Sequence, residues 1–221
     1  MKVKEADKMK FKWWGQASFL ITKSDGTKIV TDPYNEDLPY KKINDKADYV
    51  TVSHDHFDHN AVDTIPGQPY IVNNVSGFKD KKVDITGIST YHDDSEGAER
   101  GENIIFMMHL DGMKVSHMGD IGHPLDSSQV EKLKDTDILL LPVGGHFTID
   151  AGQAFEVVKK LDPKVVIPMH FKTDILDLPI KGVEKFLKYF AEESIVRIDG
   201  PEVKISELPD KQKVYVLDYV K

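Results

Sequence analysis

The sequence contains no cysteine. The chain therefore forms no disulfide bond and has no thiol nucleophile, and the common type of structural zinc site, which relies on cysteine thiolates, is disfavoured. A protein without cysteine suits a reducing compartment, so we expect a cytoplasmic location. The first ten residues are charged and hold no apolar segment of the kind that marks a signal peptide, which agrees with this expectation.

Long apolar runs and arginine are also scarce. No stretch of about 18 apolar residues occurs, so we expect no membrane-spanning helix. Arginine occurs only at Arg100 and Arg197, and the net charge is −8, with 37 acidic against 29 basic residues. Because phosphate backbones are bound mainly through clusters of lysine and arginine, this balance disfavours a nucleic-acid partner. The sequence carries no mark of a particular oligomeric state.

The remaining composition is that of an ordinary globular enzyme. The 221 residues are 40% hydrophobic and 30% charged, and no repeat, low-complexity tract or linker interrupts them. A chain of this length can bury a sizeable core. We therefore expect one domain over residues 1–221, built from two joined αβ halves.

The first half of the sequence is typical of short strands. Runs of β-branched and aromatic residues alternate with glycine and turn residues, and Asp111-Gly112 is a strong signal for a two-residue hairpin. The expected strands cover residues 11–14, 18–22, 28–31, 48–52, 70–72, 86–91, 103–110 and 113–117.

The second half alternates strands with helices. Strands are expected at 137–141, 165–167 and 214–220, and helices at 127–134, 151–161 and 183–192. Asp150 and Gln153 have the spacing of a capping box at the start of the second helix. This alternation favours an α/β fold in which helices cover a sheet.

The segment His54–His59, with the sequence HDHFDH, carries three imidazoles and two carboxylates directly after an apolar run. In extended chain, side chains two residues apart point to the same side, so His54 and His56 can bind one ion. Asp58 and His59 follow a turn and can face a second ion. Turns normally favour Gly, Asn, Asp, Ser and Pro rather than histidine. The segment therefore predicts a metal site, and paired metal ions are a recurring device for hydrolysis.

Three further candidate ligands each stand at the end of a predicted strand. They are His92, Asp120 and His170. If these strand ends meet at one edge, the three side chains complete two sites of mixed nitrogen and oxygen ligands. Asp120 can bridge the two sites because a carboxylate has two donor oxygens.

These motifs, in this order, resemble those of the metal-dependent hydrolases with the metallo-β-lactamase fold. The resemblance is greatest to the small bacterial branch that is related to ascorbate-6-phosphate lactonases. It extends over nearly the whole chain, through residues 14–19, 31–33, 54–59, 119–120, 142–148 and 167–171. It implies a four-layer αββα sandwich, with a site made by loops at one edge.

The resemblance also implies two zinc ions, each with three ligands, and one shared aspartate. The ligands implied are His54, His56 and His92 for one ion, Asp58, His59 and His170 for the other, and Asp120 between them. Asp32, in the position of the family's early aspartate, would orient one of the ligand histidines. Mn²⁺ and Fe²⁺ are alternatives to Zn²⁺, because metal availability as well as ligand type decides occupancy.

The expected reaction is hydrolysis of a small ester, lactone or phosphoester by a hydroxide that bridges the two ions. Asp58 and Asp120 would take part as ligands, and Asp58 is placed to accept the proton of the attacking water. His146, or a metal-bound water, is the candidate donor to the leaving group. Arg100 is a candidate for binding an anionic group, and Thr148 for contacting substrate. Their structural alternatives are an exposed loop arginine and a helix-start threonine.

Two other functions stay open. One is a non-catalytic metal-binding or sensing protein on the same fold, and the other is a metal-dependent phosphodiesterase that acts on nucleotides. A complete set of seven ligands favours catalysis. Two divalent ions exceed the charge of two aspartates and one hydroxide, so the expected substrate is a small anionic molecule. His117 is interpreted as a structural or ligand-supporting residue, and His109 as a surface or core residue, while His123 lies in a loop and has no assigned role.

Overall fold

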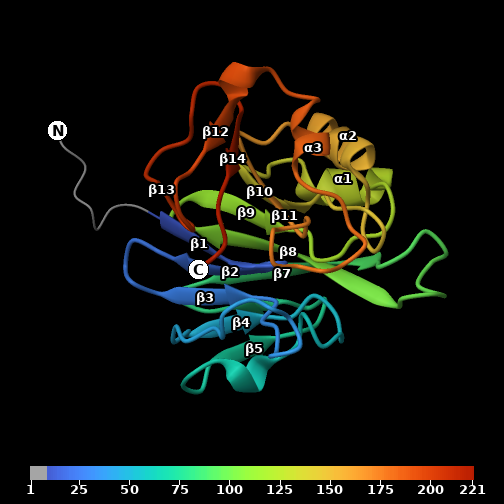
Figure 1. The fold of residues 1–221 in the computed structure, drawn as a ribbon. Helices are drawn as coiled ribbons and strands as arrows, with labels where there is room; N and C mark the ends of the chain where they lie inside the picture. Colours follow the sequence, from blue (N-terminus) through green and yellow to red (C-terminus); the bar gives the residue numbers. More distant parts are fainter. Residues whose placement is uncertain (1–8) are drawn as a thin grey trace.

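The computed structural model describes residues 9–221 and shows two stacked β-sheets with helices on one side (Figure 1). The six-stranded sheet contains, in spatial order, β13 (Glu202–Ile205), β1 (Met9–Gly15), β2 (Ser18–Thr22), β3 (Lys28–Thr31), β4 (Tyr49–Thr51) and β5 (Tyr70–Val72). Its first four strands pair antiparallel, whereas β3, β4 and β5 are parallel.

The second sheet has eight strands. In spatial order they are β12 (Ile195–Arg197), β14 (Lys213–Val216), β11 (Val165–Met169), β10 (Ile138–Pro142), β9 (Met113–His117), β8 (Glu102–Leu110), β7 (Asp84–Tyr91) and β6 (Phe78–Lys79). The strands from β12 to β9 are parallel, and those from β9 to β6 pair antiparallel.

The three α-helices lie together over the outer face of the eight-stranded sheet (Figure 1). They are α1 (Ser127–Leu133), α2 (Ala151–Leu161) and α3 (Glu184–Leu187). Two short 3₁₀ turns, η2 (Val62–Thr64) and η3 (Glu192–Ser194), also occur in the described part of the chain. Among residues 9–221, no helix has the length and apolar character that crossing a membrane requires.

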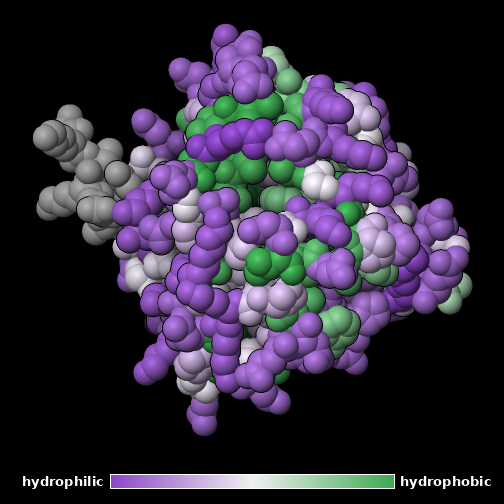
Figure 2. Space-filling view, in the orientation of Figure 1, coloured by the Kyte–Doolittle hydropathy of each residue, from purple (hydrophilic) through white to green (hydrophobic). Residues whose placement is uncertain are grey.

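The burial of the strands follows from what covers them. In β1 the buried residues Met9, Phe11 and Trp13 alternate with less buried lysines, as expected for a strand with one face on the core. β10 and β11 are buried along their whole length, because helices cover the face that the other sheet does not. Buried residues of both sheets form one contiguous apolar cluster. The visible outer surface is mainly hydrophilic (Figure 2).

The mixed α/β fold is confirmed, as are the two central sheets of the αββα sandwich that the resemblance implies (Figure 1). Among residues 9–221 the α-helices cover the outer face of the eight-stranded sheet only (Figure 1), and two predicted element boundaries are wrong. The helix expected at 183–192 ends at Leu187, because the chain turns after it so that Phe190 packs edge-on against Phe155 and Phe186. The strand expected at 214–220 ends at Val216.

Beyond Val216 the chain leaves the eight-stranded sheet. The amide of Val220 then donates to the carbonyl of Trp13 in β1, at 3.1 Å. The sequence analysis also missed β6, β12 and β13, which are only two to four residues long.

Strand direction brings the predicted ligands to one edge. β7 and β9 run the same way because both are antiparallel to β8, and β9 is parallel to β10 and β11. The carboxyl ends of β7, β9 and β11 therefore meet at one edge of the sheet. The amide of Ile104 in β8 donates to the carbonyl of Ser53, just after β4, at 2.8 Å, which joins the two sheets at this edge.

The N-terminal cap of α2 gives a test of the fold. The Asp150 carboxylate accepts the amides of Gly152 and Gln153, both at 2.9 Å, so Asp150→Ala leaves these groups without their cap. We expect the free energy of unfolding in urea to fall by about 1 kcal/mol. The control is Asp177→Ala, which removes an exposed carboxylate 3.7 Å from Lys172. Equal losses for the two variants would contradict the capping role.

Candidate metal centre

All seven predicted ligand side chains lie at the edge where the two sheets meet. Donor atoms within 4.8 Å of one another form three groups of three. Two of them are the predicted groups His54, His56 and His92, and Asp58, His59 and His170, and the third joins Asp32 to His54 and His59. Asp120 lies between the two predicted groups. Its Oδ2 atom is 3.5 Å from His92 Nε2, 3.3 Å from His59 Nε2 and 3.1 Å from His170 Nε2.

These separations match those of atoms that share a metal ion. Donors bound tetrahedrally at about 2.0–2.1 Å from one zinc ion lie about 3.3–3.4 Å from each other. The distances around Asp120 Oδ2 are 3.1–3.5 Å, and Asp58 Oδ2 lies 3.5 Å from His59 Nε2. The arrangement is therefore already spaced to hold a cation.

Several polar atoms of the cluster are buried without a hydrogen-bond partner among the described residues. They include His54 Nε2, His59 Nε2 and Asp120 Oδ1. Buried polar atoms are rarely left unpaired in folded proteins, since each costs about 1–3 kcal/mol. A bound cation accounts for the two imidazole nitrogens, so the residues present fit a metal.

The electrostatic surroundings of the cluster also favour a bound cation. Burial alone would lower the pKa of His59, but the Asp120 and Asp58 carboxylates outweigh it and hold that pKa well above its usual value. Burial opposes ionisation of Asp120, yet His170 and His59 bring its pKa well below the usual range. Burial, together with the charge on His59, lowers the pKa of His54 to about 3. The two carboxylates thus attract a positive charge, which a metal ion can supply.

Asp32 follows β3 and contacts the side of the His59 ring that is turned away from Asp120. Its Oδ2 atom contacts His59 Nδ1 at 2.9 Å, and its two oxygens accept the amide and hydroxyl of Ser53 at 2.8 and 2.5 Å. With its oxygens occupied in this way, Asp32 is placed to orient His59 rather than to bind an ion. The contact with Nδ1 leaves His59 Nε2 directed at Asp58 and Asp120.

Two supporting residues were missed in the sequence. Ser53 contacts His54 Nδ1 at 2.9 Å, which leaves Nε2 of that ring for the site. Asn103 accepts the amide of Asp120 at 2.9 Å and donates to Met118 and Thr90. For Asn103, the sequence offered one signal of a special role, namely a polar asparagine in the otherwise apolar run 103–110.

Glycine is required at the turn before Asp120. Gly119 has φ +54°, and a Cβ there would lie 2.3 Å from Asn103 Oδ1 and 2.6 Å from Ser53 Cβ. Backbone strain also occurs at the site itself, because Asp32 and His170 have φ values of +38° and +49°. Non-glycine residues in this region are strained, and such residues gather at functional sites.

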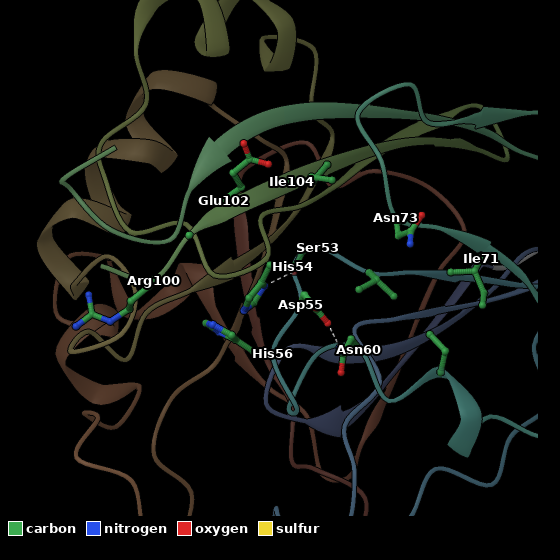
Figure 3. A pocket seen from close by; sticks show the side chains of 13 residues that line it. Ser53, His54, Asp55, His56, Asn60, Ile71, Asn73, Arg100, Glu102 and Ile104 are labelled. Atoms are coloured by element: carbon green, nitrogen blue, oxygen red, sulfur yellow. Dashed lines mark hydrogen bonds between the residues drawn. The ribbon is translucent and has the colours of Figure 1, made fainter. Parts of the chain in front are cut away.

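Arg100 lies beside the cluster. It lines a cavity of about 670 Å³ together with His54 and His56, and Figure 3 shows it on one side of these rings, with Ile71 and Asn73 on the other. Its guanidinium lies 3.6 Å from the carboxylate of Glu99.

Asp93 shapes the loop that carries Arg100. Its carboxylate accepts backbone amides at 2.7–3.0 Å from Ser95, Gly97, Glu99 and Arg100. Burial raises the pKa of Asp93, but these four amide donors outweigh it and lower the pKa to about 2.

The structure does not bring His146 and Thr148 into that cavity. His146 lines a second cavity of about 640 Å³, with Gly144 and three lysines, and its ring contacts Phe147. Thr148 is buried, and its hydroxyl donates to the carbonyl of Ile149 at 3.2 Å. The catalytic role of His146 and the substrate role of Thr148 stay predictions.

The other histidines have structural surroundings. His117 is fully buried, with Nε2 2.8 Å from the Ala17 carbonyl and Nδ1 accepting the Gly119 amide at 3.3 Å. Burial lowers its pKa, in keeping with a neutral ring. His123 accepts the Tyr91 amide at 3.2 Å, and His109 is exposed on β8.

Comparison with known proteins supports the resemblance seen in the sequence. Residues 10–170 match the family described as "Beta-lactamase superfamily domain". A relative from Archaeoglobus fulgidus, named UPF0173 metal-dependent hydrolase, is 31% identical, with 81% of this chain and 90% of the relative covered. A protein of the same name from Pelotomaculum thermopropionicum is 32% identical, with 75% and 85% covered.

A solved structure is similar over the whole fold. It comes from Thermotoga maritima and is described as a proposed zinc-dependent hydrolase of the metallo-β-lactamase superfamily. It is 38% identical, with a TM-score of 0.82 and with 96% of this chain and 100% of that chain covered. The link to ascorbate-6-phosphate lactonases stays a prediction.

The loop of Arg100 provides a test of the site's construction. Asp93→Ala removes the acceptor of four amides, so hydrogen exchange over residues 95–100 should accelerate by about tenfold or more. Asp94→Ala, at the exposed neighbouring position, should leave these rates unchanged. Unchanged exchange in Asp93→Ala would show that the loop is ordered by other contacts.

Proposed function

The chain belongs to the beta-lactamase superfamily, and from this premise we propose that it is a metal-dependent hydrolase that cleaves a small ester, lactone or phosphoester with two divalent metal ions. The observation that carries the proposal is the set of imidazole nitrogens spaced 3.1–3.5 Å from one oxygen of the buried Asp120. This spacing suits coordination of a shared cation, and the buried unpaired nitrogens of His54 and His59 support the same interpretation.

The proposed ligands divide into the two groups of three described above, with Asp120 common to both. Two ions held by these residues would activate a water as the nucleophile near neutral pH and would polarise the substrate oxygen. Five imidazoles and two carboxylates suit borderline cations, and Zn²⁺ is the first choice from the donor types.

The protein side chains have distinct proposed roles around that reaction. Asp58 is the candidate proton acceptor, because its side chain is 14% exposed, whereas that of Asp120 is 2% exposed and surrounded by imidazoles. His146 is the candidate donor to the leaving group. It lies two residues after Gly144, where a Cβ would be only 2.2 Å from the His170 carbonyl oxygen, so its loop packs directly against the site.

The cavity beside His54 and His56 suggests the type of substrate. Arg100 presents a partly exposed guanidinium at one side, and Ile71 and Ile104 are on the lining with it. A guanidinium binds carboxylate and phosphate well. We therefore propose a small substrate with one anionic group and a modest apolar part.

The test of the function combines metal counting with turnover. The metal-loaded protein should bind two ions per chain and hydrolyse a chromogenic phosphodiester or a member of an acyl lactone panel. His54→Ala and His170→Ala should each lower the count by one and the rate by about a hundredfold or more. His109→Ala, on the exposed side of β8, is the control and should do neither. Full occupancy with no turnover of any substrate would favour the non-catalytic alternative.

A second test concerns Asp32. Because this carboxylate orients His59 through Nδ1, Asp32→Ala should weaken metal binding by about 10–100-fold in a chelator competition. Asp32→Asn keeps the shape and should lose less. Thermal unfolding of the metal-free variants separates this effect from a loss of folding, and the exposed Asp63→Ala is the control. An unchanged affinity in a folded Asp32→Ala would contradict the orienting role.

A further inference from the structure

Gln16 is a buried polar residue that belongs to neither of the two proposed groups of metal ligands. It lies in the turn between β1 and β2, is 1% exposed, and has a left-handed backbone with φ +49°. Its carbonyl oxygen accepts the indole N–H of Trp13 and the backbone amide of His170, both at 3.0 Å. Strain of this kind persists only where the surroundings hold it, and here they hold Gln16 against His170.

The side chain of Gln16 reaches the second group of candidate ligands. One end of its amide lies 2.9 Å from Asp58 Oδ2 and 2.7 Å from His170 Nε2. The other end, Oε1, is buried without a partner among residues 9–221. The two ends of an amide have nearly the same shape, so a half turn about the last bond exchanges nitrogen and oxygen and moves the NH2 group to the buried place of Oε1.

A bound ion changes which end of the amide is favoured inside. Once His170 Nε2 and Asp58 Oδ2 direct lone pairs at a cation, the imidazole has none left to accept an N–H, and an amide N–H there faces a positive charge. An amide oxygen in that place is instead attracted by the cation, and side-chain amide oxygens are regular metal ligands.

The distances also fit a ligand. Donors in an octahedral shell with bonds of about 2.1 Å lie about 3.0 Å apart, which is shorter than the tetrahedral separation. Nε2 of Gln16 lies 2.7 and 2.9 Å from the two ligand atoms, which is hydrogen-bond range and also near the octahedral separation. The other donors of this group are 3.1–3.5 Å apart, so a further ligand would bring the Asp58 and His170 side of the shell closer to octahedral spacing.

We propose that Oε1 of Gln16 is a further ligand of the ion held by Asp58, His59 and His170. The inference rests on the proposed metal centre and extends it. With the shared Asp120, this ion then has five protein donors, three of them oxygens, and one place for water or substrate. A six-coordinate, oxygen-rich site favours Mn²⁺ or Fe²⁺ over Zn²⁺ at this position, whereas the site of His54, His56 and His92 stays suited to zinc.

The competing explanation is that Gln16 only donates an N–H to Asp58 and positions it. Three variants separate the two roles. Gln16→Glu keeps an oxygen at the position and adds charge, Gln16→Met keeps the length without an amide, and Gln16→Asn shortens the reach but tolerates the left-handed backbone best. A ligand role predicts that glutamate binds the ion at least as tightly as glutamine. A donor role predicts that glutamate weakens binding, because it places a second carboxylate against Asp58.

The experiment measures Mn²⁺ affinity by chelator competition and the visible absorption of the Co²⁺-loaded protein, in which four-coordinate ions absorb much more strongly than six-coordinate ones. Gln16→Met and Gln16→Asn should weaken binding of the ion at Asp58, His59 and His170 by about tenfold or more. They should also strengthen the visible absorption of the Co²⁺-loaded protein. Gln16→Glu should keep the affinity and the weak absorption of the natural protein.

Two results would overturn the inference alone: unchanged binding and spectra in both Gln16→Met and Gln16→Asn, or a loss in Gln16→Glu as large as in Gln16→Met. Unfolding of the metal-free variants shows whether each one folds, and Gln16→Asn serves if Gln16→Met does not. Failure of the natural protein to bind two ions would instead refute the metal centre itself, so the two failures are distinguishable.

Discussion

The Oδ2 oxygen of Asp120 lies within 3.5 Å of imidazole nitrogens from three separate segments of the chain, in a place that is almost closed to solvent. A buried carboxylate is stabilised by positive charge close by, and the buried imidazole nitrogens require a partner for their lone pairs or protons. A cation satisfies both requirements at once. The parallel arrangement of β7, β9 and β11 makes this meeting possible, because it delivers His92, Asp120 and His170 to one edge.

A second set of contacts holds this arrangement in place. Asp32 and Ser53 fix the rings of His59 and His54 through their Nδ1 atoms, and Asn103 fixes the backbone of Asp120. Gly119 has no side chain, so Asn103 and Ser53 can pack against its backbone at distances that a Cβ atom would prevent. All of these contacts are made by protein groups, so the fold itself orients the ligands.

The predictability of the site depended on the kind of signal each residue left in the sequence. His54 to His59 stand out by composition, and His92, Asp120 and His170 stand out because each ends an apolar strand. Ser53, Asn103 and Gln16 are single polar residues whose importance lies in partners distant in the chain, up to 154 positions away for Gln16 and His170. No local pattern reveals these partners, although Gln16 lies within the segment 14–19 that carries the resemblance. The boundary errors at Leu187 and Val216 have a similar origin, since tertiary contacts end the helix and redirect the strand.

The central claim is that two ions flank Asp120, and anomalous diffraction from crystals grown with Mn²⁺ or Zn²⁺ tests it most directly. The account predicts two anomalous peaks, one on each side of the Asp120 carboxylate. One should be within about 2.0–2.3 Å of donors from His54, His56 and His92, and the other within that distance of donors from Asp58, His59 and His170. A single peak, or peaks that Asp120 does not contact, would contradict it.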